Sequence, residues 1–280
     1  MTPGSFENHH TPFCDHQNEM SLQEQWQDHS EEMRRAAVVL CNTGVALMER
    51  HSFPQANVVL NNALKVSRFM FRDDRTENIY ETNANMLQEK LRTAASMLSN
   101  PVKPSPLPNL QVTTIPDDIC RSRIDVLLSC DPRAPSSQST RQIKVFPIRI
   151  DDSGLDTLSF DELCGIVAYN FSLSFLCMSK MMPSMSDPRS QGHRCNAMRV
   201  LRLCSQIIAS DMEISPTSRT FLLTILRLQA MSEALVDHGR IDKASECLNL
   251  LEEMVVEAQA YYAMELAFGC RPKRYPAPAA

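Results

Sequence analysis

Glycine is scarce in this sequence, and its scarcity excludes several kinds of site. The 280 residues include only seven glycines, and they lie far apart. A loop that cradles phosphate groups needs closely spaced glycines, as in the G-x-G-x-x-G and P-loop motifs. The catalytic motifs G-x-S-x-G and H-E-x-x-H are also missing. We therefore expect neither a nucleotide-binding fold nor an enzyme, and we expect no cofactor.

Aromatic residues and long apolar runs are also rare. Aromatics make up 6% of the chain, although apolar residues as a whole make up 43%. Much of this apolar content is Leu, Val, Ala and Met, which suits packed helices better than a β-sandwich. The longest apolar run, residues 165–178, is interrupted by Asn170 and falls short of the ~20 residues that a membrane span needs. We expect a mainly α fold, with this run as a core helix and no membrane span.

Paired cysteines and a strong positive charge are likewise absent. Ten cysteines are present, but no two have the C-x-x-C spacing of a zinc site. Several fall in apolar helical stretches, which predicts free thiols in a reducing compartment. The formal net charge of −5 offers no general attraction to nucleic acid. The N-terminus lacks a secretory pattern. We expect an intracellular, cytoplasmic location, with the nucleus as the alternative.

Both ends of the chain have the composition of disordered tails. Residues 1–20 are polar and rich in His, Pro and Asn, and residues 269–280 contain a small basic cluster. Four possible ligands for a soft metal lie in the first tail: His9, His10, Cys14 and His16. We favour a disordered tail and expect no metal site. The acidic pairs Asp117-Asp118 and Asp151-Asp152 suit turns, because adjacent strand side chains point to opposite faces.

A helical hairpin is predicted after the first tail. Ser21-Leu22-Gln23-Glu24 has the form of a capping box, which predicts a helix from Ser21 to about Arg50. Small and apolar residues recur along it every three or four positions: Met33, Ala37, Leu40, Gly44 and Leu47. Ser52-Phe53-Pro54 then opens a second helix, with Pro54 tolerated in its first turn.

A third helix and an insert follow this hairpin. A stripe from Tyr80 to Leu98 predicts a helix, and we favour packing on the hairpin over a coiled-coil dimer, because the stripe spans under three heptads. Residues 21–100 thus form an N-terminal helical region. Four prolines between residues 101 and 108 predict a stiff linker. Short β-like pieces at 110–115 and 143–150 make residues 101–157 a Pro/Ser-rich linker with an irregular or β-hairpin insert.

The C-terminal region, residues 158–268, is predicted to contain two further hairpins. Ser159-Phe160-Asp161-Glu162 is a second capping box, and an apolar helix over 163–178 follows it. The Met-rich segment 181–193 is expected to be an exposed loop, either an adaptable binding surface or a flexible insertion. A return helix is expected over 194–208. Ser215-Pro216 then predicts a helix to Asp237, and Gly239 a turn into a last helix over 241–263.

An internal repeat links the first hairpin to the last. The residues Gly44, Leu47, Ala56, Leu60 and Ala63 have the same offsets as Ser232, Leu235, Ala244, Leu248 and Leu251. Small residues at the first and third positions let two helices approach closely. The middle hairpin has Ser172 and Phe175 in one helix and Ala197, Leu201 and Cys204 in the other.

These spacings resemble the tetratricopeptide (TPR) repeat. The Pro147 to Ile150 segment followed by Tyr169-Asn170-Phe171-Ser172-Leu173 is also similar to an uncharacterised algal TPR-like family. The resemblance implies TPR-like antiparallel helical hairpins of the α-solenoid type. It also implies a partner groove on the first helix, formed by Val38, Cys41, Asn42, Val45 and Glu49.

A protein-binding role follows from these patterns as an expectation. We expect a scaffold or adaptor without catalytic activity that holds a protein or peptide partner, whose identity the sequence does not give. Two alternatives stay open at this stage. The first is an enzyme or metal-binding protein with a site between the helical halves, and the second is a structural subunit of an oligomer.

Overall fold

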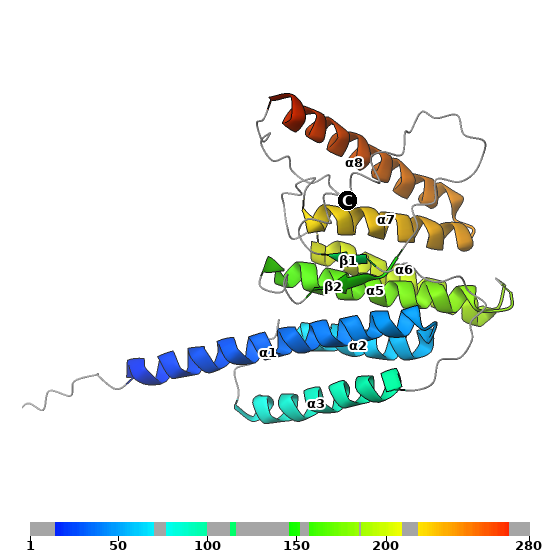
Figure 1. Cartoon of the computed structure of the whole chain (residues 1–280). Helices are drawn as coiled ribbons and strands as arrows, with labels where there is room; N and C mark the ends of the chain where they lie inside the picture. Colours follow the sequence, from blue (N-terminus) through cyan, green and yellow to red (C-terminus); the bar gives the residue numbers. More distant parts are fainter. Residues whose placement is uncertain are drawn as a thin grey trace, which may run out of the picture.

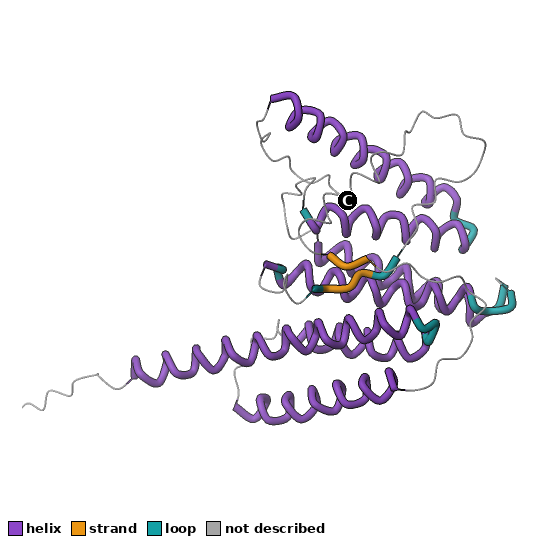
Figure 2. The backbone as a smooth tube through the Cα atoms, viewed as in Figure 1, coloured by secondary structure: helices purple, strands orange, loops and turns teal. Residues whose placement is uncertain are grey.

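The protein is mainly helical. The computed structural model describes residues 15–69, 77–99, 113–115, 146–151, 157–184, 186–208 and 218–268. These residues form seven helices and two short strands (Figures 1 and 2). In chain order they are α1 (Asp15–Glu49), α2 (Phe53–Phe69), α3 (Glu77–Ser99), β1 (Thr113–Ile115), β2 (Ile148–Ile150), α5 (Phe160–Lys180), α6 (Pro188–Ile208), α7 (Arg219–Asp237) and α8 (Ile241–Phe268). The predicted linker prolines, Asp117-Asp118 and the tail residues His9, His10 and Cys14 lie outside the described residues.

Helix α1 begins earlier than the sequence predicted. It starts at Asp15, so Ser21 lies inside the helix and residues 15–20 are not part of a tail. The S-x-x-E pattern is only a preference for a helix start. The six residues before Ser21 contain neither Gly nor Pro, so nothing in them ends a helix. Residues 1–14 lie outside the described part of the chain.

The turn between α1 and α2 is a Schellman motif. The Ser52 N–H donates to the Leu47 carbonyl at 2.9 Å, and the His51 N–H donates to the Met48 carbonyl at 2.9 Å. His51 has a φ of 57°, the left-handed conformation that this position requires. The turn between α7 and α8 repeats the pattern, with bonds from Gly239 to Val236 and from Arg240 to Leu235.

These two turns support the internal repeat found in the sequence. Gly239, with a φ of 76°, occupies the position of His51 when Gly44 is aligned with Ser232. Gly44 itself permits the close approach of α1 and α2, because a Cβ built on it would lie 2.5 Å from Cγ of Leu60. The equivalent of Leu60 in the last hairpin, Leu248, is 43% exposed. The match is therefore close at the turn and looser along the helices.

The two strands pair in parallel, and this corrects the predicted β-hairpin. Thr113 pairs with Ile148, and Ile115 pairs with Ile150. A hairpin needs antiparallel strands joined by a short turn, whereas residues 116–147 separate this pair. Strand β2 also belongs to the main core, because Phe146, Ile148 and Ile150 are buried in the same apolar cluster as the helices. The insert is thus not a separate unit at its C-terminal end.

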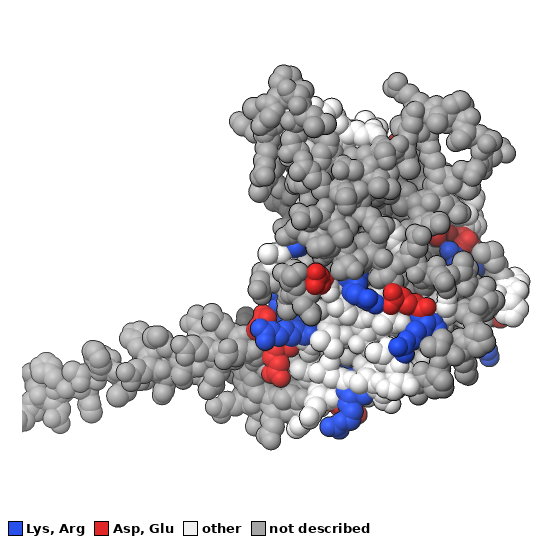
Figure 3. Space-filling view, viewed as in Figure 1, with Lys and Arg blue, Asp and Glu red and all other residues white. Residues whose placement is uncertain are grey.

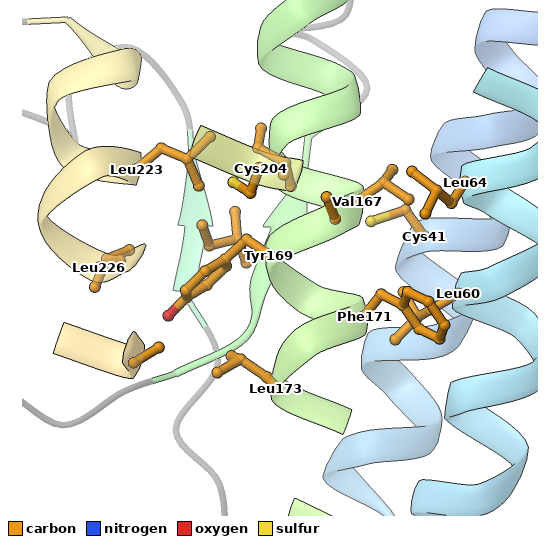
Figure 4. Close-up of a cluster of buried hydrophobic side chains, with 14 of the residues drawn as sticks. Cys41, Leu60, Leu64, Val167, Tyr169, Phe171, Leu173, Cys204, Leu223 and Leu226 are labelled. Atoms are coloured by element: carbon orange, nitrogen blue, oxygen red, sulfur yellow. The ribbon is translucent and has the colours of Figure 1, made fainter. Parts of the chain in front are cut away.

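Helix α5 is the central helix of the protein. The predicted capping box is confirmed: the Ser159 hydroxyl accepts from the Glu162 N–H, and the Glu162 carboxylate accepts from the Ser159 N–H. Figure 4 shows why this helix is so apolar. Val167 and Phe171 point toward Cys41, Leu60 and Leu64 of the first hairpin, while Tyr169 and Leu173 point toward α7.

Among the described residues, α5 is also the one helix long and apolar enough to cross a membrane. Of its apolar window, 83% is buried inside the protein. This is weak evidence for a span, because a core helix passes the same test.

Two helix starts in the C-terminal region differ from the prediction. Helix α6 begins at Pro188 rather than Arg194, because the Asp187 carboxylate caps it by accepting from the Arg189 N–H at 2.8 Å. Part of the expected Met-rich loop is therefore helix. Helix α7 begins after Ser218 rather than at Ser215, since the Ser218 hydroxyl accepts from the Phe221 N–H. The last helix runs to Phe268, five residues beyond the prediction at Ala263.

The helices pack in pairs along one direction. The pairs α1 with α2, α5 with α6, and α7 with α8 are in contact, and α2 packs against α5. Figure 1 shows α3 at one end, α8 at the other, and the two strands beside α5 in the middle. Helix α3 packs on α1 and buries Leu87 and Ala94. We call α1, α5 and α7, the first helix of each pair, the A helices.

Candidate functional site

The five predicted groove residues lie on one side of α1, and most of that side is covered by the rest of the chain. Val38, Cys41 and Val45 are buried in the core, with exposures of 2%, 0% and 0%. Asn42 and Glu49 contact residues of the chain's own strand β2. Val38, Cys41 and Val45 therefore line no open groove, and a partner contact at Asn42 and Glu49 stays a prediction. Helical periodicity identified a face that needs a partner, but it does not say whether the partner is another protein or a distant segment of the same chain.

The side chain of Asn42 binds the backbone of Ile150, the last residue of β2. Its Nδ2 donates to the Ile150 carbonyl at 2.7 Å, and its Oδ1 accepts from the Ile150 N–H at 2.9 Å. An amide side chain that makes both bonds replaces a neighbouring strand at that position. The contact is independent of which side chain residue 150 carries.

Asn170 of α5 makes the same pair of bonds to the first residue of β2. Its Oδ1 accepts from the Ile148 N–H at 2.8 Å, and its Nδ2 donates to the Ile148 carbonyl at 2.7 Å. The second hydrogen of Nδ2 is directed to Cys41 Sγ at 3.3 Å. Asn170 has an exposure of 0%, so these bonds satisfy a polar group that is fully removed from water.

The two asparagines occupy equivalent positions of the internal repeat. Asn42 lies two residues before Gly44, and Asn170 lies two residues before Ser172, which is aligned with Gly44. The structure adds that they bind residues 150 and 148 of one strand, whose backbone groups face the same edge. The sequence-based prediction included Asn42 and missed Asn170 as a site residue. The repeat alignment was the signal that would have found it.

Two further contacts hold the segment, one just before the strand and one at its middle residue. The Tyr169 hydroxyl donates to the Phe146 carbonyl at 3.2 Å, and Tyr169 is itself fully buried. Burial raises the pKa of this hydroxyl well above its usual value, with a smaller contribution from Glu233. At the other face of the strand, Arg149 pairs with Glu49 at 2.7 Å. Both of these charged groups are more than one-third exposed, so water screens their attraction.

The backbone just after the strand is bound in a similar way. Arg34 of α1 donates to the Leu158 carbonyl. Arg219 of α7 donates to the Thr157 carbonyl at 3.0 Å and to its hydroxyl at 2.8 Å. All three A helices therefore contribute side chains that hold residues within 146–150 or 157–158. We call the surface formed by Asn42, Glu49, Tyr169 and Asn170 the segment-binding face.

The buried cysteines near this face are unsuited to nucleophilic chemistry. Burial raises the pKa of the thiols of Cys41, Cys177 and Cys204 to about 12, and the hydrogen bond from Asn170 only partly offsets this at Cys41. A thiol with such a pKa stays protonated at neutral pH, and the thiolate is the reactive form. Cys41 and Cys204 are buried in the core, and Cys177 is partly buried against it.

A metal centre is not present among the side chains that the structure describes. No group of three or more His, Cys, Asp or Glu side chains in those residues is placed to hold an ion. Charged side chains on the face shown in Figure 3 are of both signs and interspersed. The described surface thus offers no single-sign patch on that face.

Exposed apolar side chains gather on the last helical pair. Nine large apolar residues are exposed in the described part of the chain, and six of them belong to α7 or α8. These six are Val236, Ile241, Leu248, Leu250, Val256 and Met264. Helix α8 packs on α7 and leaves these side chains uncovered.

Comparison with models of protein families, with curated proteins and with solved structures returned no match for this chain.

Proposed function

We propose that this protein is a TPR-like helical scaffold that binds other proteins and performs no reaction. The observation that carries the proposal is the equivalent placement of Asn42 and Asn170, which hold alternate residues of one extended segment. Main-chain hydrogen bonds of this kind are a general way to bind an extended polypeptide, because every peptide unit offers the same donor and acceptor. Helices α1 and α5 form the surface that makes them.

The repeated turn geometry supports the repeat-scaffold part of this proposal. The Schellman turns at His51 and Gly239 have the same hydrogen bonds at the same offset from the small residues of the repeat. Stacked helical pairs present their first helices side by side along one surface. A residue that recurs in that surface can therefore bind successive residues of one ligand.

Site-specific photo-cross-linking tests this function. We would replace Glu49, at the exposed edge of the segment-binding face, with p-benzoylphenylalanine in the full chain. The matched control is the same replacement at Glu253, an exposed residue on α8. We expect covalent adducts with a defined set of proteins from position 49 and none of these from position 253.

Other outcomes separate the alternatives. Adducts that contain only a second copy of the chain would favour a structural subunit of an oligomer. An absence of adducts at position 49, in a chain that circular dichroism shows to be folded, would contradict the scaffold function and favour the enzyme alternative.

A further inference from the structure

The hydrogen bonds that hold β2 on the segment-binding face can also form with segments of other sequence. Four of them join Asn42 and Asn170 to backbone atoms of Ile150 and Ile148, and a fifth joins Tyr169 to the Phe146 carbonyl. None involves a side chain of the strand. Any extended segment with free backbone groups at the two central positions can form the same set.

The side chains of the strand define what kind of segment fits best. Ile148 and Ile150 have exposures of 0% and 4%, so both are buried in the apolar core. Arg149 lies between them, points to the other face and pairs with Glu49 at 2.7 Å. Alternate apolar positions therefore flank one basic position, which an acidic side chain contacts.

We propose that β2 is a built-in occupant of this face, and that the face binds, in its place, an extended segment of another protein with the pattern apolar, basic, apolar. This inference rests on the proposed function and names both the partner chemistry and its competitor. The contacts that β2 makes with this face, through its backbone, its apolar side chains and its charged side chain, define the pattern that a partner segment must have. The partner segment would add its own strand edge beside β1.

The covalent connection of β2 sets the competition. A segment of the same chain faces its site at an effective concentration on the order of millimolar, so a free segment of equal intrinsic affinity competes poorly. Wild-type protein should bind such a segment weakly. Weakening the hold of β2 should open the face without removing the asparagines.

A binding titration with a synthetic peptide tests the inference. The probe is a fluorescein-labelled peptide with the sequence of residues 144–151, and the readout is fluorescence anisotropy. The full-length chains are wild type and the double variant Ile148→Ser with Ile150→Ser, checked for wild-type helicity. We expect the variant to bind the peptide about 100-fold more tightly than wild type does.

A charge exchange provides the matched control. A peptide with Glu in place of its Arg should bind the double variant about fivefold more weakly, and adding Glu49→Arg to the chain should restore that affinity. A general loosening of the fold would not produce such a rescue. If the double variant does not fold, Ile150→Ala replaces it, with a smaller gain over wild type.

Three results would overturn the inference. They are no peptide binding by a folded variant, equal binding of wild type and variant, and dimerisation of the variant that the peptide does not reverse. The last would identify a second copy as the occupant. Photo-cross-linked partners at position 49 would still support the scaffold in each case, so the two proposals can fail separately.

Discussion

Asn42 and Asn170 are 128 residues apart in the chain, yet their side-chain amides bind the backbone of residues two positions apart in one strand. Each amide both donates and accepts, so each acts as a short piece of neighbouring strand. The two asparagines lie in corresponding turns of the first helices of two helical pairs. Two helices that are far apart in the sequence thus make the same kind of contact to one strand.

Removing the two amides should destabilise the protein unequally. Asn170→Ala leaves a buried N–H and a buried carbonyl of Ile148 without partners, and we expect a loss of roughly 2–5 kcal/mol in the free energy of unfolding. Asn42→Ala breaks two hydrogen bonds that are only part-buried, and about 1–2 kcal/mol is expected. Urea unfolding measures both. Equal losses would contradict the difference in burial that underlies the prediction.

The two Schellman turns provide a matched pair of backbone tests. His51→Gly should stabilise the protein by up to about 1 kcal/mol, because it relieves a left-handed non-glycine residue. It also removes an Nδ1 atom that is buried without a hydrogen-bond partner, at the loss of a ring contact with Phe53. Gly239→Ala should destabilise by about 1 kcal/mol, since open space surrounds the new methyl group and only the φ of 76° opposes it.

Thermal unfolding would give both values. A lower melting temperature for His51→Gly would mean that the ring contact outweighs the backbone term.

Gly44 should be intolerant of any side chain. Gly44→Ala places a Cβ 2.5 Å from Leu60 Cγ, and we expect a loss of about 1–3 kcal/mol from overpacking. The double variant of Gly44→Ala with Leu60→Ala should lose less stability than the sum of the losses in the two single variants. The reason is that the truncated side chain at position 60 no longer clashes with the new methyl group. A double-mutant cycle by urea unfolding tests this coupling, and strict additivity would contradict the close approach.

The buried thiols should weaken the fold at alkaline pH. The pKa values of Cys41, Cys177 and Cys204 are raised by burial from 9.0 to about 12 in the folded protein. Below pH 9 these thiols are protonated in both states, and their contribution to stability is fully present. Between pH 9 and 12 the unfolded chain loses its protons first, so the free energy of unfolding should fall as pH rises.

Urea midpoints from pH 8 to 11 would measure this fall. The slope should be smaller in Cys41→Ala than in wild type, while Cys195→Ser, at an exposed thiol, should leave it unchanged.

Local signals in the sequence predicted local structure well. The capping box at Ser159 and the left-handed turn at Gly239 are confirmed because each depends on a few adjacent residues. The same S-x-x-E pattern at Ser21 was wrong as a helix start, since the flanking residues also favour helix. A local preference decides the outcome only where its neighbours do not compete.

Long-range relationships were the part that the sequence did not settle. The β pieces were found, but no local pattern in either piece indicates that they pair in parallel. The face of α1 was found too, while its occupant lies more than one hundred residues away. A contact to backbone atoms does not constrain which residue is bound, so the sequence of β2 does not indicate it. The repeated asparagine was the one signal of this contact in the sequence.

Amide hydrogen exchange at Ile148 and Ile150 tests the paired backbone contact most directly. In Asn42→Ala, exchange of the Ile150 amide should rise about tenfold or more relative to Ile148, as one hydrogen bond is lost. Asn170→Ala should expose the Ile148 amide, beyond any global loss of stability. Asn57→Ala, which breaks an asparagine contact to Ser174 away from the strand, serves as the control. Unchanged protection of both amides in the two variants would contradict the account.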